Sequence, residues 1–176
     1  AKRVSRIEHR NAFGLAMLRM DYSYTVNDLP EFITETSNVG GTWFAVGTTG
    51  FGYDAHHRLV YEYRTGANYY AFEYSYDEGG NRTQKWDYGQ QRLTEYHYDV
   101  DNPSLYHRDN NRLMSSETYE LISGNPGGPL VSTTWYTYTP GGNVERIITK
   151  AEPSGGQQQN AMSGEGQSST LSAEAI

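Results

Sequence analysis

The sequence contains no cysteine, which excludes disulfides, a thiolate nucleophile and a cysteine-ligated zinc site. It has no apolar run near the roughly 20 residues that a membrane-spanning helix needs, and no basic-then-apolar leader near Ala1. Only 36% of the residues are apolar, so we expect no compact hydrophobic core. Because the chain starts at Ala1 rather than Met, we expect it to be a piece of a longer protein.

Positive charge is also scarce. The 14 basic residues are scattered among 21 acidic ones, and the formal net charge is −7. A nucleic-acid backbone is bound by clustered Lys and Arg, so this composition disfavours a nucleic-acid partner.

What the chain has in abundance is tyrosine and glycine, with 16 Tyr and 19 Gly. Tyr, Thr and Trp suit the pleated, half-buried surface of a sheet, and Gly, Asn and Asp suit the turns between strands. The composition therefore predicts an all-β fold.

One short pattern recurs along the chain: an aromatic residue, any residue, Tyr, then Asp or Thr. The five copies are Tyr22-Ser-Tyr24-Thr, Phe51-Gly-Tyr53-Asp54, Tyr74-Ser-Tyr76-Asp77, Tyr96-His-Tyr98-Asp99 and Tyr136-Thr-Tyr138-Thr139. Their spacing corresponds to a unit of roughly 22 residues. Turn residues follow, as in Asp77-Glu-Gly-Gly80-Asn81-Arg82 and Thr139-Pro-Gly-Gly142-Asn143, so each unit is predicted to be strand, tight turn, strand, with positive φ in the turn.

The pattern predicts consecutive antiparallel hairpins over residues 1–150, with the Tyr rings forming a cross-strand ladder on one face. Expected strands are 15–25, 31–36, 69–76, 82–88, 92–98 and 131–139. Residues 100–112 and 124–129 are predicted loops. Residues 151–176 are rich in Gly, Gln and Ser, and we expect a disordered tail there.

These residues resemble the YD-repeat or Rhs-repeat proteins, whose unit runs roughly Tyr-x-Tyr-Asp-x-x-Gly-Arg. Residues 74–83 match best; His57 stands where Gly is usual, and Thr replaces Asp in the first and last copies. The residues that carry the repeat are Tyr22, Tyr24, Phe51, Tyr53, Asp54, Tyr74, Tyr76, Asp77, Gly80, Asn81, Arg82, Tyr96, Tyr98, Asp99, Tyr136, Tyr138, Gly142 and Asn143.

The resemblance implies a curved, twisted sheet that forms part of the wall of a hollow β-shell, which in some family members surrounds a toxic polypeptide. It implies a secreted or cell-surface bacterial protein whose partners are neighbouring repeats and an enclosed toxin-like polypeptide. A glycan is the partner that exposed Tyr and Trp would suit instead. Self-cleavage in the family uses an Asp-Pro-containing motif, and this sequence has no Asp-Pro dipeptide. Autoproteolysis is therefore not assigned to these residues.

No residue pattern indicates an enzyme, a metal site or a cofactor. His56 and His57 are adjacent in an expected turn, and His97 is expected to face solvent from a strand. The recurring Asp54, Asp77 and Asp99 suit turns better than a catalytic pair. We expect a non-catalytic scaffold without membrane insertion; the alternative is a carbohydrate- or peptide-binding surface that uses exposed Tyr, Trp, Asp and Asn.

Overall fold

The computed structural model describes residues 2–99, 111–152 and 170–171, and these residues form β-strands joined by turns. The chain divides into two compact units: residues 1–74 with 87–89, and residues 75–86 with 90–176. We call them the N-terminal and C-terminal units. The described residues contain no helix that is long and apolar enough to cross a membrane.

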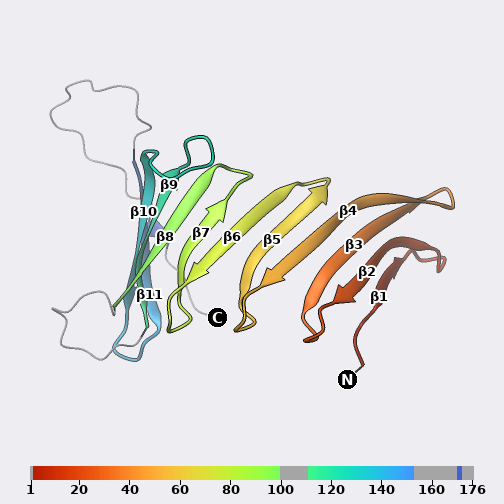
Figure 1. The fold of residues 1–176 in the computed structure, drawn as a ribbon, viewed down its shortest axis with the longest axis horizontal. Helices are drawn as coiled ribbons and strands as arrows, with labels where there is room; N and C mark the ends of the chain where they lie inside the picture. Colours follow the sequence, from red (N-terminus) through yellow and green to blue (C-terminus); the bar gives the residue numbers. More distant parts are fainter. Residues whose placement is uncertain (1, 100–110, 153–169, 172–176) are drawn as a thin grey trace. The chain divides into compact units, whose positions relative to one another are not determined.

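In the N-terminal unit the strands pair antiparallel in chain order (Figure 1). The strands are β1 (Arg6–Arg10), β2 (Ala16–Tyr24), β3 (Pro30–Val39), β4 (Thr42–Tyr53), β5 (Leu59–Gly66) and β6 (Tyr70–Tyr76), the last of which ends beyond the unit's boundary. This order is what short connections between neighbouring strands produce.

The C-terminal unit repeats this arrangement, with antiparallel neighbours again following chain order. Its strands are β7 (Arg82–Asp87), β8 (Arg92–Tyr98), β9 (Leu113–Glu120), β10 (Leu130–Tyr138), β11 (Val144–Ala151) and the short β12 (Thr170–Leu171). The all-β class and the consecutive antiparallel hairpins are thus confirmed. Of the predicted loop at 100–112, residues 100–110 lie outside the described residues, as do residues 153–169 and 172–176 of the predicted tail at 151–176.

Glycine in β4 is explained by the strand beside it. Gly50 lies opposite Tyr63, and a Cβ atom added to Gly50 would overlap the Tyr63 ring. Gly therefore lets the aromatic ring lie across the backbone of the neighbouring strand, an arrangement that protects a strand glycine. The sequence pattern predicted a strand at the Phe51–Tyr53 motif but not the part of β4 that precedes Phe51, because glycine is normally depleted in strands.

The interior is thin, as the composition predicts. The buried hydrophobic residues are Ala71, Tyr74, Leu93 and Leu121, and among the described residues no large side chain is completely buried. Polar pairing supplements it: Glu35 and Arg64 form two hydrogen bonds of 2.7 Å in the N-terminal unit, across the strand between them. Cross-strand threonine pairs, such as Thr94 with Thr118 at 3.2 Å, recur in the C-terminal unit. The sheet is stabilised more by hydrogen bonds and side-chain pairs between strands than by a hydrophobic core.

Candidate functional site: the motif turns and an acidic histidine cluster

Four of the five sequence motifs end in the same turn, and a longer connection follows the fifth, at Asp99. In the Asp77 copy, the Asp77 N–H donates to the Asn81 carbonyl at 2.9 Å, and the Gly80 N–H donates to the Asp77 carbonyl at 3.2 Å. The turns that begin at Thr25, Asp54 and Thr139 have the same two hydrogen bonds. At Asp99 the bond equivalent to the first of these is present, from the Asp99 N–H to the Arg112 carbonyl at 3.0 Å. The motif is therefore a turn signal, as its spacing predicted.

The Asp or Thr side chain caps each turn. Asp54 Oδ1 accepts from the His56 and Arg58 N–H groups, both at 2.9 Å, and Asp77 Oδ1 accepts from the Asn81 N–H at 2.8 Å. A threonine hydroxyl does the same more weakly at Thr139, which the Asn143 N–H reaches at 3.3 Å. This shared role explains why Thr can stand for Asp.

The residue before the closing position has positive φ in every copy. Its φ is 87° at Gly80, 88° at Gly142, 63° at His57, 65° at Asp28 and 51° at Asn111. Gly adopts this conformation without strain, and Asp, Asn and His are the other residues found there more often than most. The structure thus shows why His57 can replace the usual Gly.

In the four motif copies whose strand register is described, a bulge occurs at the same place relative to the motif. The strand register shifts at Tyr24, Tyr53, Tyr98 and Tyr138, always between the motif's middle residue and its final Tyr. The unpaired extra residue lies on the strand after the turn, six positions beyond the capping residue in the continuous copies: Glu31, Val60 and Glu145, with Met114 equivalent after the longer connection. A bulge increases the local twist, so each repeat twists its hairpin at an equivalent place.

Successive repeats are joined through the last Tyr of the motif. The Tyr138 hydroxyl donates to the Leu113 carbonyl at 2.7 Å, and the Arg112 guanidinium lies 5.5 Å from the centre of the Tyr138 ring. Near the other end of the chain, Tyr24 donates to the Val4 carbonyl at 2.7 Å while Arg3 lies 5.4 Å from its ring centre. The same hydroxyl bond and cation–π contact therefore occur in both units.

The predicted aromatic ladder needs correction. In the registers given for β2–β3, β4–β5, β8–β9 and β10–β11, the first aromatic residue of each motif is opposite a non-aromatic residue: Tyr22 faces Ile33, Phe51 faces Glu62, Tyr96 faces Ser116 and Tyr136 faces Ile147. Close ring pairs along a strand do occur, as for Tyr70 and Phe72 at 5.0 Å. The bulges and turns fix the register, so ring-on-ring pairing is not what sets it.

Arg82 of the best-matching copy lies among tyrosines. Burial of its guanidinium lowers its pKa, but hydrogen bonds and electrostatic interactions with Tyr96 and Tyr76 together raise it above the ordinary value. Burial is the largest cause of the raised pKa of Tyr98 and Tyr138. These groups are positioned to hold neighbouring strands together.

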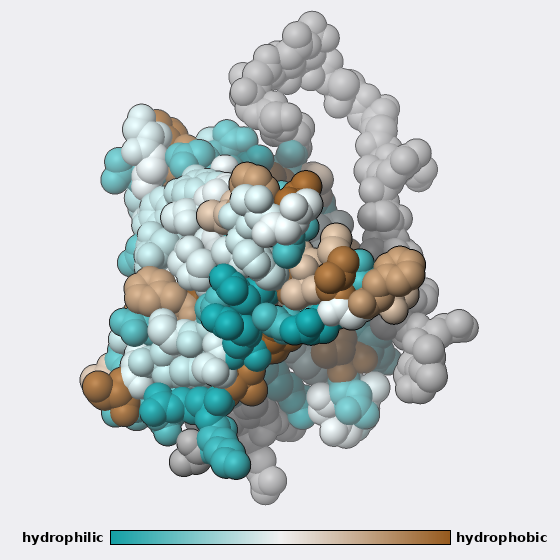
Figure 2. Space-filling model, turned by 90° about the vertical axis from the view of Figure 1, so that its right-hand side faces the viewer, coloured by the Kyte–Doolittle hydropathy of each residue, from teal (hydrophilic) through white to brown (hydrophobic). Residues whose placement is uncertain are grey.

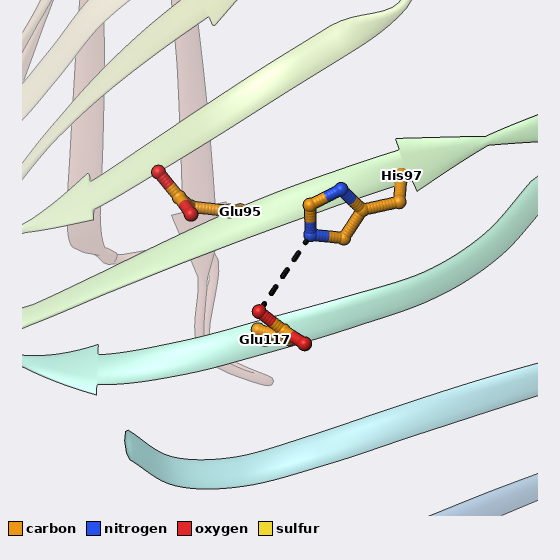
Figure 3. Close-up of side chains that lie close together, drawn as sticks. All are labelled: Glu95, His97 and Glu117. Carbon is orange, nitrogen blue, oxygen red and sulfur yellow. Dashed lines mark ion pairs between the residues drawn. The ribbon is translucent and has the colours of Figure 1, made fainter. Parts of the chain in front are cut away.

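A separate group of titratable side chains lies on the β8–β9 hairpin: Glu95, His97 and Glu117 (Figure 3). Their ligand-capable atoms lie within 4.8 Å of one another, and His97 Nε2 is 3.8 Å from Glu117 Oε2. Sequence reasoning placed His97 on the face away from Tyr96 and Tyr98 but did not connect it with Glu117. The period-two spacing of Glu95 and His97 was the available signal.

The other histidines singled out in the sequence do not form such a group. His56 and His57 are exposed in the turn after β4, and the nearest side-chain partner recorded for His57 is Asn27 at 3.2 Å. Asn81 uses its side-chain amide within the turn, donating to Asp77 Oδ2 at 2.8 Å. The turn interpretation of these residues agrees with their positions.

Exposed apolar side chains occur on the N-terminal unit. A groove of about 420 Å³ is lined by Leu15, Met17 and Val39 among others, and Phe13 and Leu15 are among the most exposed apolar residues, at 89% and 64%. Figure 2 shows brown apolar side chains beside teal and white ones on the side of the molecule that it presents. From the sequence we expected a binding surface to use exposed Tyr and Trp, and we did not predict this aliphatic surface.

Three solved structures illustrate what the chain is similar to. They are TcdB2-TccC3-TEV (18% identity, TM-score 0.45), TcdB2-TccC3 (17%, 0.46) and a Photorhabdus luminescens Tc holotoxin pore with a mutation in TccC3 (15%, 0.45). The alignments cover 82%, 82% and 83% of this chain but 8%, 8% and 9% of those chains. No family model and no curated protein matches. The chain therefore spans less than a tenth of the length of those chains.

Proposed function

We propose that the chain is a non-catalytic repeat scaffold, one section of a larger β-wall that encloses or displays another polypeptide in a secreted or surface protein. The observation that most supports this proposal is that the recurring motifs end in turns of one kind. Wherever the strand register around a motif is described, it also shifts at the same motif position. A catalytic residue is usually unique in its chain. Here the distinctive residues recur in equivalent structural roles, which is typical of repeat architecture.

A repeat wall needs edges that accept further strands. β1 pairs only with β2 among the described strands. Because the Tyr22 N–H donates to the Ser5 carbonyl and antiparallel hydrogen bonding alternates, the N–H groups of Arg6 and Glu8 point to the open side of β1. Charged residues on this strand limit unspecific pairing.

Edge pairing can be tested with the variant Glu8→Pro. Proline removes the outward N–H group but leaves the β1–β2 hydrogen bonds in place, so folding should persist. Sedimentation equilibrium should show weaker self-association for Glu8→Pro than for the control Glu8→Ala, which removes the charge alone. Equal association of both variants, or a wild-type chain that stays monomeric at the highest soluble concentration, would contradict an edge that receives neighbouring strands.

A second candidate is binding of an extended peptide with apolar side chains, favoured by the groove at Leu15, Met17 and Val39. A peptide array and a glycan array separate it from the scaffold. Saturable peptide binding that Val39→Glu abolishes would support the binding surface. Binding that tolerates this substitution would exclude the groove as its site.

A further inference from the structure

The hairpin β8–β9 brings three metal-ligand side chains to one face. Glu95 and His97 are two residues apart on β8 and thus project from the same side, and Glu117 on β9 lies directly opposite Glu95. Figure 3 shows the His97 ring turned toward the Glu117 carboxylate, with Glu95 on the same strand as His97. All three side chains are half-buried.

The opposition of Glu95 and Glu117 is electrostatically unfavourable. Like charges directly across an antiparallel pair destabilise it, whereas a cation shared by the two carboxylates offsets the repulsion. His97 supplies a neutral nitrogen ligand when deprotonated. Two carboxylates and one imidazole form a donor set that suits zinc and related divalent transition metals.

The distances favour ligation over a direct hydrogen bond. His97 Nε2 and Glu117 Oε2 are 3.8 Å apart, which exceeds the roughly 3.2 Å limit of an N–H···O bond. Two ligands of one tetrahedral zinc are separated by about 3.4 Å, given zinc–ligand bonds of about 2.1 Å. His97 Nε2 is also inaccessible to solvent and has no hydrogen-bond partner among the described residues.

Neighbouring side chains orient both carboxylates. Gln84 Nε2 donates to Glu95 Oε1 at 3.0 Å, and the Tyr119 hydroxyl donates to Glu117 Oε2. Metal-ligating carboxylates are commonly held by such second-layer hydrogen bonds.

We propose that Glu95, His97 and Glu117 bind a divalent transition-metal ion of the zinc class, with water completing the coordination. The ion joins β8 to β9 close to the long connection between Asp99 and Arg112. Since binding favours the folded hairpin, the stability of this unit depends on the concentration of the metal. This inference does not depend on the scaffold proposal.

The test is zinc binding by the full chain near neutral pH, measured by competition with a chromogenic chelator and by metal analysis after dialysis. One zinc per chain is expected. His97→Asn and Glu117→Gln should each weaken binding by at least about 10-fold. Glu120→Gln on the same strand and His56→Asn in a turn are matched controls and should leave the affinity unchanged.

Circular dichroism should confirm that each variant is folded. In a second measurement, the NMR spectrum of the imidazole nitrogens in the nitrogen-15-labelled chain, adding zinc should shift the Nε2 signal of His97. Acid should weaken binding, because a protonated ligand atom has no lone pair to donate to the metal. The proposal fails if the folded chain binds no zinc, if His97→Asn binds as tightly as wild type, or if His56→Asn alone abolishes binding.

Discussion

The turns at 54–58 and 77–81 have nearly the same backbone but different residues. Each is capped by Asp and has a positive φ before its last position, yet this φ belongs to His57 in one turn and Gly80 in the other. The cap carboxylate also bonds differently: Asp54 forms an ion pair with Arg58 at 2.7 Å, and Asp77 accepts from the Asn81 amide at 2.8 Å. The repeat therefore conserves a backbone conformation and a cap, while the residues that supply them vary.

The largest effect is expected at the Tyr that precedes each turn. Tyr76→Ala and Tyr53→Ala should each lower the free energy of unfolding by about 2–3 kcal/mol, since both rings are half-buried and a fully buried aromatic side chain would cost more. Urea denaturation measures both. If Tyr76→Ala left the free energy of unfolding unchanged while Tyr53→Ala lowered it strongly, the two turns would not be equivalent.

The next effect separates the two positive-φ positions. Gly80→Val should cost about 1–3 kcal/mol, because a β-branched residue is strained at φ 87°. A Cβ at Gly80 would have no atom within 4 Å, so the cost comes from the backbone alone. Gly80→Asn, which tolerates this conformation, is the control and should be milder in the same denaturation experiment. Equal losses of stability in Gly80→Val and Gly80→Asn would contradict a cost that is set by the backbone φ.

The reverse substitution at the other turn should be small and favourable. His57→Gly relieves backbone strain but frees the unfolded chain, so the net gain should be about 0.5 kcal/mol or less. His57→Ala should be nearly neutral because its side chain is exposed. Thermal melts of both variants decide this. A marked loss of stability in His57→Ala would assign the imidazole a specific role.

The smallest difference concerns acid and salt. Hydrogen bonding to the Arg58 backbone holds the pKa of Asp54 below its ordinary value, and the Asn81 side-chain amide does so for Asp77. A depressed folded-state pKa stabilises the fold above the unfolded value of about 3.9, and this stabilisation is lost as pH falls through the folded pKa.

Carboxyl NMR titration at low and high salt should therefore separate the two caps. The Asp54 pKa should rise toward its ordinary value in high salt, because salt screens its ion pair with Arg58, which is only half-buried. The Asp77 pKa should change less, since Asn81 carries no charge. An equal salt response would contradict the distinction between an ionic cap and an amide cap.

The sequence predicted the local features well because turns and strand periods are short-range. Expected strands at 82–88, 92–98 and 131–139 correspond to β7, β8 and β10 with ends within one residue, and the positive φ at Gly80 and Gly142 was expected from Gly next to Asn. The features that it missed depend on neighbouring strands. β4 is stabilised by Tyr63 across Gly50, and Glu117 reaches Glu95 only through the β8–β9 register.

The turn that begins at Asp99 shows how much chain such a closure can accommodate. Its cap joins Asp99 to the Arg112 N–H at 3.1 Å across 13 positions of sequence, whereas the Asp54 cap spans four. Loop-closure entropy rises by only about 0.6 kcal/mol for each doubling of length. For protein engineering, the capped hairpin tips are therefore graft positions, at which a foreign epitope or small domain can be inserted while the clamp at the loop's base keeps the strand register.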